Sequence, residues 1–163
     1  MRALLDVNVL IAGLLSRTGA PARLLGKWLE GEFELVISDR LLDELEKTLA
    51  RPKLRRLIDD NEASAFIELL VADSPNGSRI RTRPRASDLA TRRTYLIAAA
   101  SSARATLVTR DADLLQLAGS IPVISSRALS WELSRSSGRS LYGLHFVPYE
   151  ALRFAPAARA MLG

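Results

Sequence analysis

Short apolar segments alternate with stretches of helical periodicity, and this alternation constrains the fold more than any other feature. We expect strands at residues 3–5, 33–37, 106–109 and 122–124, with helical patterns between them. Mostly apolar strands that alternate with helices are typical of a parallel sheet covered by helices on both faces. The pattern therefore predicts an α/β fold, a three-layer α/β/α sandwich with a central, mostly parallel sheet of four to five strands.

The alternating pattern ends at Leu133, and this position divides the chain. We predict one domain over residues 1–133, a size that buries a core without disulfides or structural metals. Residues 134–163 begin with a linker-like run of Ser, Arg and Gly and continue into a tail that contains several aromatic residues. This tail is predicted to pack on the domain or to serve a partner.

Composition narrows the chemistry and the partners. The chain contains no cysteine and a single histidine, His145, which excludes disulfide scaffolds, thiol nucleophiles and Cys- or His-rich metal sites. Its net charge is +5, and all but three of the 23 cationic residues are arginines. Because arginine binds phosphate in a bidentate way, this bias favours a nucleic-acid partner, although a genome rich in arginine codons produces the same bias.

The sequence contains no recognisable targeting or membrane-spanning segment. Asp6 interrupts the first apolar stretch, and no later apolar run approaches the ~20 residues of a spanning helix. We expect a cytoplasmic protein without a membrane partner.

Three carboxylates stand out by their position. Asp6 and Asp111 each follow an expected strand, at the end where α/β sheets bind their ligands. Glu44 lies beside the apolar stripe of the helix that is expected to follow Ser38. Each also has a purely structural interpretation, because the aspartates could cap the next helix and Glu44 could pair with an arginine. If the three carboxylates converge, they repel one another and would either protonate or gather a divalent cation.

Oxygen-only ligands favour Mg²⁺ or Mn²⁺ over zinc. Such ions polarise a phosphodiester and activate water, while a basic surface would hold the polyanion. The residues therefore point to a metal-dependent nuclease.

Three segments resemble, in chain order, motifs of PIN-domain ribonucleases. Residues 4–10 (Leu-Leu-Asp-Val-Asn-Val-Leu) resemble the opening strand with its Asp-x-Asn signature, and residues 38–45 (Ser-Asp-Arg-Leu-Leu-Asp-Glu-Leu) the second acidic motif. Residues 108–115 (Val-Thr-Arg-Asp-Ala-Asp-Leu-Leu) resemble the fourth strand and its aspartate. The similarity covers about residues 1–130 and is nearest to VapC-like toxins of toxin–antitoxin pairs.

The resemblance implies an endoribonuclease in which metal-activated water attacks RNA. It further implies a homodimer that is blocked by a cognate antitoxin protein. Carried over residue by residue, it predicts catalytic roles for Asp6, Glu44 and Asp111; Mg²⁺ or Mn²⁺ ligation by Asp6, Glu44, Asp111 and Asp113; supporting roles for Asn8, Ser38, Thr94 and Thr109; and RNA binding by Arg92, Arg93 and Arg110.

One departure from the family pattern opens a second hypothesis. The family usually has an aspartate before the Leu/Ile-Ala stretch of its long helix, and the matching position here is Thr94, preceded by two arginines. Threonine offers a neutral oxygen and no charge, so the chain could bind RNA or an antitoxin without cleaving RNA. A third class, a haloacid-dehalogenase-type phosphatase with Asp6 as nucleophile, is disfavoured because Asn8 replaces its second aspartate.

The segment at residues 74–87 combines Pro, Gly and several arginines, and we expect a loop there. Its arginines would contact an RNA backbone or remain solvated.

Overall fold

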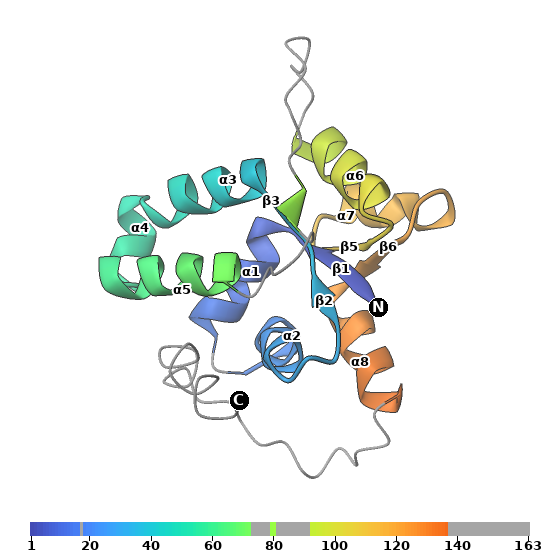
Figure 1. The fold of residues 1–163 in the computed structure, drawn as a ribbon, viewed down its shortest axis with the longest axis horizontal. Coiled ribbons are helices and arrows are strands. Elements are labelled where there is room, and N and C mark those ends of the chain that lie inside the picture. The colour runs from blue at the N-terminus through green and yellow to red at the C-terminus, as the bar shows by residue number, and fades with distance from the viewer. Residues whose placement is uncertain (17, 73–78, 81–91, 137–163) are drawn as a thin grey trace.

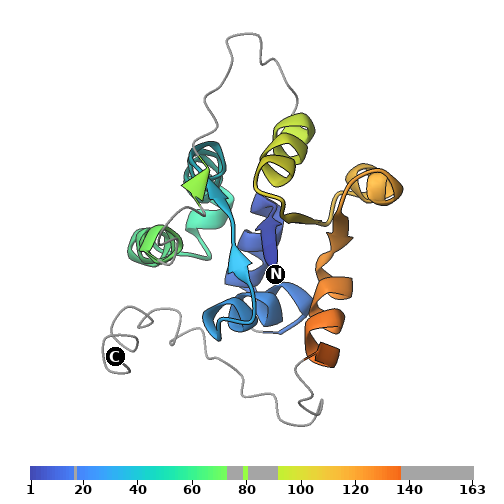
Figure 2. The ribbon, with the colours of Figure 1, turned by 45° about the vertical axis from the view of Figure 1, so that its right-hand side comes forward.

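The sheet that was expected from the sequence is the centre of the fold. The computed structural model describes residues 1–16, 18–72, 79–80 and 92–136. Four parallel strands form one sheet in the order β2-β1-β5-β6 (Figures 1 and 2). These strands are β1 (Arg2–Leu5), β2 (Glu34–Leu35), β5 (Thr106–Thr109) and β6 (Val123–Ser125).

The register of the two central strands places their ends together. Leu5 of β1 is the partner of Val108 in β5, and the backbone N–H of Asp6 donates to the carbonyl of Val108 at 2.9 Å. The next residues, Asp6 and Thr109, therefore lie beside each other where the strands end. Because all four strands are parallel, this carboxyl edge is the side from which ligands can approach the strand ends.

Helices cover both faces of the sheet, as predicted for the three-layer fold. One layer is formed by α1 (Val7–Leu15), α2 (Ala20–Leu29) and α8 (Ser126–Ser136), and α6 (Arg92–Ser102) packs on β1 and β5 from the other side (Figures 1 and 2). Strand residues between the layers, such as Leu4, Leu5, Leu107 and Val108, are fully buried. No helix in the described ranges has the length and apolar character needed to cross a membrane.

A second group of helices lies beyond the β2 edge of the sheet. It consists of α3 (Asp39–Leu49), the short α4 (Pro52–Arg55) and α5 (Asp60–Ala72) (Figure 1). The strand expected at residues 33–37 is divided here, because the chain leaves β2 after Leu35 and resumes as β3 (Ile37–Ser38). The prediction of a loop over residues 74–87 is wrong at 79–80, where β4 (Arg79–Ile80) pairs with β3 in parallel.

Close backbone packing joins α1 to α2. Gly13 of α1 lies so near α2 that a Cβ atom built on it would stand 2.6 Å from Cδ1 of Leu25. A larger residue at position 13 would therefore push the two helices apart.

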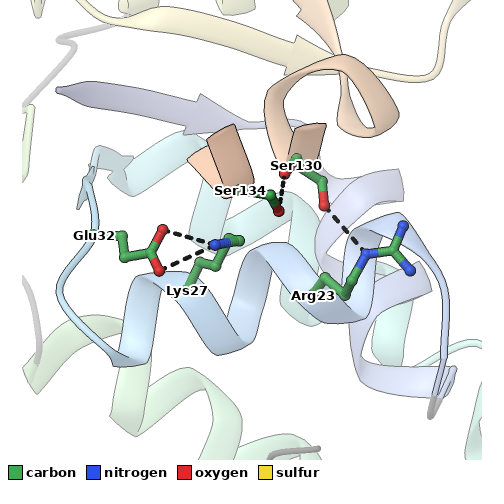
Figure 3. Close-up of polar contacts among 5 residues, drawn as sticks. All are labelled: Arg23, Lys27, Glu32, Ser130 and Ser134. Carbon is green, nitrogen blue, oxygen red and sulfur yellow. Dashed lines mark hydrogen bonds and ion pairs between the residues drawn. The ribbon is translucent and has the colours of Figure 1, made fainter. Parts of the chain in front are cut away.

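Polar side chains connect α2 with its surroundings (Figure 3). Arg23 Nε donates to the buried Ser130 Oγ of α8 at 3.2 Å, and Ser134 Oγ donates to the Ser130 carbonyl. Lys27 binds both carboxylate oxygens of Glu32 at 2.8 and 3.0 Å. Of these contacts, the bond from Arg23 to Ser130 joins α2 to α8. Helix α8 continues to Ser136, three residues past the predicted domain boundary, and the remaining tail, 137–163, lies outside the described residues.

The amino edge of the sheet carries a separate ion pair. Arg2 of β1 forms two hydrogen bonds of 2.9 Å with the carboxylate of Glu34 in β2. The hydrogen bond to Glu34 and its negative charge raise the pKa of the Arg2 guanidinium above its ordinary value. This pair lies at the opposite end of β1 from Asp6 and ties the two strands together.

The last part of the sheet is completed by short elements. After β5, the chain forms α7 (Ala112–Leu115) and a 3₁₀ turn over Gln116–Gly119 before β6. The connection from β5 to β6 thus combines a short α-helical and a 3₁₀ segment.

Candidate active site

Three helices each begin directly after a strand, α1 and α7 at the carboxyl edge of the central sheet and α3 after β3, and a predicted site residue caps each of them. Asp6 accepts from the backbone N–H two residues on at 3.3 Å and caps α1. Ser38 Oγ accepts from the backbone N–H three residues on at 3.2 Å and caps α3, and Asp111 Oδ1 caps α7 at 3.0 Å. The structural interpretation of both aspartates as helix caps is therefore correct, and it leaves a chemical role open because the caps hold both aspartates at the carboxyl edge.

Thr109 connects the two strand-end aspartates. Its hydroxyl donates to Oδ2 of Asp6 at 2.9 Å and accepts from the backbone N–H of Asp111 at 3.1 Å. Asp6 is only 2% exposed and Thr109 is completely buried, whereas Asp111 is half-buried. Because a hydroxyl has a single proton, the bond to Asp6 makes Thr109 an acceptor toward Asp111. The hydroxyl thus orients the buried carboxylate and the chain that carries the second one.

Glu44 is held by a contact that connects α3 to α6. The Tyr95 hydroxyl donates to Oε2 of Glu44 at 3.3 Å, and the tyrosine is only 6% exposed. The guanidinium of Arg40, one turn before Glu44 on α3, stacks over the ring of Tyr95 at 4.3 Å from its centroid. Sequence reasoning missed both Tyr95 and Arg40. The available signal was that Tyr95 is the one aromatic residue in the alanine-rich helical stretch.

The predicted metal ligands are not gathered into one large cluster. Within the described part of the chain, no group of three or more His, Cys, Asp or Glu side chains is arranged to hold a metal ion. Asp6 and Asp111 are linked through Thr109, Glu44 contacts Tyr95, and Asp113 is exposed in the first turn of α7. Ligation by Asp6, Glu44, Asp111 and Asp113 stays a prediction.

The donor chemistry of the linked pair nevertheless suits one kind of ion. Mg²⁺ typically keeps several water ligands and is held by one or two carboxylates together with substrate phosphates. Asp6 and Asp111 supply two such carboxylates at one edge, so the residues present fit Mg²⁺ or Mn²⁺ better than an ion that needs a complete protein cage.

The remaining residues that were predicted to support the site or to bind RNA differ in how far they are exposed to solvent. Asn8 is exposed in the first turn of α1, and its backbone N–H is the group that binds Asp6. Thr94, the third residue of α6, and Arg110, which follows β5, are exposed. Arg92 and Arg93 begin α6, and the predictions for their side chains lie outside the described residues.

Fold and site together define an α/β protein with aspartates at the carboxyl ends of parallel strands. The family model for the PIN domain matches residues 2–113, and the chain belongs to the PIN-domain family. PIN domains are typically nucleases that generally use divalent metals, and membership therefore indicates a nuclease that binds RNA. A comparison with curated proteins gave no match, and neither did a comparison with solved structures.

Proposed function

We propose that this protein is a divalent-metal-dependent endoribonuclease whose catalytic residues are Asp6, Glu44 and Asp111. The observation that carries the proposal is the connection from the Asp6 carboxylate through the Thr109 hydroxyl to Asp111. Two carboxylates held at neighbouring strand ends are suited to share a cation, and this supports the proposal.

Each residue of the site has a defined part in this proposal. Asp6 and Asp111 would hold Mg²⁺ or Mn²⁺, with Glu44 and Asp113 as further ligands. When bound, the ion polarises the phosphodiester and lowers the pKa of a water molecule. Thr109 holds Asp6 in one orientation, and Tyr95 does the same for Glu44 through its hydroxyl.

We further propose that this endoribonuclease is the toxin of a toxin–antitoxin pair. The support is the order of the three motifs, which is similar to that of VapC-like toxins, and the net charge of +5, which favours RNA as substrate. We include in the proposal a homodimer, inhibition by a cognate antitoxin protein and action in the cytoplasm. Growth arrest on expression in a bacterium, relieved by a neighbouring gene product, would test this assignment.

A second candidate is a PIN-like protein that binds RNA or an antitoxin without cleaving RNA. Two observations favour it. Thr94 is neutral and exposed where the family usually has an aspartate. The described residues also contain no group of three or more acids placed to hold a metal ion. Loss of a group that supports a metal site typically weakens metal affinity or activity on the order of 10–100-fold. A missing acid would therefore impair cleavage while the fold persists.

Two measurements separate the candidates. Purified full-length protein is incubated with structured RNA in EDTA, Mg²⁺ or Mn²⁺, and Mn²⁺ binding is measured by isothermal titration at physiological salt. The first candidate requires metal-dependent cleavage and a heat of binding, both abolished in Asp6→Asn. Asp59→Asn is the matched control, because Asp59 also accepts a backbone N–H at 2.7 Å but lies at the exposed start of α5. RNA binding without cleavage in either metal would establish the second candidate.

A further inference from the structure

A cluster of exposed cations lies where the chain passes from α3 to α4. Residues 47–56 contain five cations and no acid, and all five cationic residues are exposed. They are Lys47, Arg51, Lys53, Arg55 and Arg56. We call residues 47–56 the basic elbow, which lies at the margin of the fold, where the chain turns from α3 through α4 toward α5 (Figure 1). Exposed like charges that are close together create a positive potential that attracts anions.

The acids of these three helices lie outside the basic elbow. From the start of α3 to the end of α5 the chain has eight acids and six cations, so this region as a whole is not basic. The sixth cation is Arg40, near the start of α3. The acids are Asp39, Asp43, Glu44 and Glu46 on α3, Asp59 just before α5, and Asp60, Glu62 and Glu68 on α5. The positive charge of the elbow therefore arises because cations and acids are separated along the chain.

Among the described residues, four of the five elbow cations have no bound acid. Arg55 forms an exposed ion pair with Asp60 at 3.2 Å. The carboxylates of Asp59 and Glu62 instead cap the start of α5, where each accepts the backbone N–H of the other residue, at 2.7 and 3.3 Å. Within the described part of the chain, no hydrogen bond or ion pair involves the side chains of Lys47, Arg51, Lys53 and Arg56. These four charges are therefore available to a ligand.

One face of α3 leads from the candidate site to the basic elbow. Lys47 and Arg51 follow Glu44 by three and seven residues, the spacing that places residues on one face of a helix. At ~1.5 Å of rise per residue, Arg51 lies about 10 Å along the helix axis from Glu44. Glu46 lies nearly opposite Glu44 around the axis, whereas Asp43 is one turn before Lys47 and offsets part of its charge. The elbow therefore continues the face of α3 that carries a proposed catalytic carboxylate.

The chemistry of the elbow matches a polyanion with phosphate groups. Arginine presents a planar fork of donors that binds phosphate in a bidentate way, and lysine adds a point charge. Stable protein–protein contacts depend instead on buried aromatic or apolar anchors at their centre. Among the described residues of the elbow and its immediate neighbours, Leu57 is the one exposed large apolar side chain, at 67%. A nucleic-acid backbone thus fits this surface better than an acidic protein.

We propose that the basic elbow binds backbone phosphates of the RNA strand that leaves the candidate active site along α3. This inference rests on the proposed function in taking RNA as the substrate, and it adds a binding surface outside the site. The surface is separate from Arg92 and Arg93, which begin α6, and from Arg110, which follows β5. At the duplex spacing of about 3.4 Å per phosphate, a strand would place about three phosphates over the span from Glu44 to Arg51.

The first test measures RNA binding separately from cleavage. Fluorescence anisotropy with a labelled single-stranded RNA of about 12 nucleotides, within the usual range of binding-site sizes, is recorded for the full chain in EDTA at several salt concentrations. The triple variant Arg51→Gln, Lys53→Gln and Arg56→Gln is expected to bind at least about tenfold more weakly. The slope of log K against log salt should fall by about 1.4–2.1, since each lost phosphate contact on a single strand contributes about 0.7.

A matched triple variant controls for net charge. Arg104→Gln, Arg127→Gln and Arg135→Gln remove the same charge from exposed positions before β5 and on α8. The salt slope of this control should change by less than about 0.7, the value of one phosphate contact. Thermal melts of both triple variants confirm that the proteins remain folded.

The second test asks whether one strand spans the site and the elbow. The chain contains no cysteine, so Lys53→Cys introduces a single thiol that can carry a photo-crosslinker. The crosslinks in a bound RNA should fall on one side of the position that the wild-type protein cuts. Arg127→Cys, labelled in the same way, should crosslink far less. Crosslinks from position 53 that are spread evenly along the RNA would contradict a strand that runs along α3.

The outcomes distinguish this inference from the proposed function. If the wild-type protein cleaves nothing in Mg²⁺ or Mn²⁺ but the elbow variant alone loses RNA affinity and salt slope, the proposed hydrolysis fails and RNA binding by the elbow holds. Wild-type affinity and slope in the elbow variant, or an equal loss in the control, would overturn the inference even if the protein cleaves RNA. A labelled polyglutamate peptide is titrated in parallel. Loss of its binding in the elbow variant, with RNA affinity unchanged, would assign the surface to an acidic protein and also overturn the inference.

Discussion

The Thr109 hydroxyl donates a 2.9 Å hydrogen bond to Oδ2 of Asp6, and this bond joins residues 103 positions apart in the sequence. The bond exists because β1 and β5 are adjacent and parallel, with Leu5 opposite Val108. Both side chains are buried. The orientation of the central carboxylate is therefore fixed by a neighbouring strand as well as by its own helix cap, which is the kind of rigid support that a catalytic group needs.

Thr109→Val tests the energetic importance of this bond. Valine keeps the shape of the side chain but leaves a buried oxygen of Asp6 and the N–H of Asp111 without the hydroxyl. We expect the free energy of unfolding to fall by about 1–3 kcal/mol, the cost of an unsatisfied buried polar group. Urea denaturation measures the change. Thr106→Val, at the half-buried start of the same strand, should change it by less than about 0.5 kcal/mol. Equal effects at both positions would contradict the assigned role of Thr109.

Asp6→Asn separates charge from capping. Asparagine caps helices about as well as aspartate, so the protein should stay folded, with a stability loss of about 1 kcal/mol or less. Loss of the negative charge should lower RNA cleavage at least about a hundredfold, equivalent to ~2.7 kcal/mol of activation free energy. The measurement is the initial rate of RNA cleavage in Mn²⁺, with circular dichroism to confirm folding. A folded Asp6→Asn variant that retains full activity would contradict a catalytic role for Asp6.

The contact between Tyr95 and Glu44 can be measured by a double-mutant cycle. Tyr95→Phe, Glu44→Ala and the double variant should show an interaction energy of at least about 0.5 kcal/mol in urea denaturation, because the bond has a charged acceptor in a half-buried setting. The comparison cycle uses Glu46→Ala, since Glu46 is exposed on α3. Its interaction energy with Tyr95→Phe should be near zero, and additivity in the first cycle would show that the 3.3 Å contact contributes nothing.

Gly13→Ala tests the packing of α1 on α2. Alanine favours helix by up to about 1 kcal/mol, but its Cβ would meet the Leu25 side chain at 2.6 Å and the Pro21 carbonyl at 3.0 Å. Leu25 is buried and has little room to move, so overpacking at about 1–3 kcal/mol should dominate and lower the stability. Gly119→Ala has no neighbour within 4 Å and should leave the melting temperature unchanged or slightly raised. A stabilised Gly13→Ala variant would mean that the helices can separate at little cost.

Local patterns were sufficient to predict most of the fold. The strands of the central sheet are apolar because helices cover both faces, and this burial is visible in the sequence as continuous apolar runs. Asp6, Ser38 and Asp111 were recognisable as helix caps because capping depends on residues only two or three positions apart. Since the same aspartates follow parallel strands, their place at the carboxyl edge also followed from the pattern.

Features that depend on distant contacts were not predictable in this way. The strand β4 contains two residues, too few to show a periodicity, and it exists because its backbone pairs with Ile37 and Ser38. The short helix α4 has four residues and none of them is buried, so its sequence shows no apolar stripe that would predict a helix. Tyr95 of α6 contacts Glu44 of α3 across 51 positions, and only the tertiary fold brings the two side chains together.

Thr94→Asp asks whether one missing acid limits the activity. Position 94 lies in the first turn of α6, next to Tyr95, and an aspartate there is favoured by the positive end of the helix dipole, so the variant should fold. If metal affinity is limiting, a further carboxylate should raise the cleavage rate in Mn²⁺ at least about tenfold, which corresponds to ~1.4 kcal/mol. Asn61→Asp is the control, because it adds the same charge to the exposed first turn of α5. A Thr94→Asp variant no more active than its parent would refute the assignment of position 94, and an equal gain in Asn61→Asp would attribute the effect to net charge.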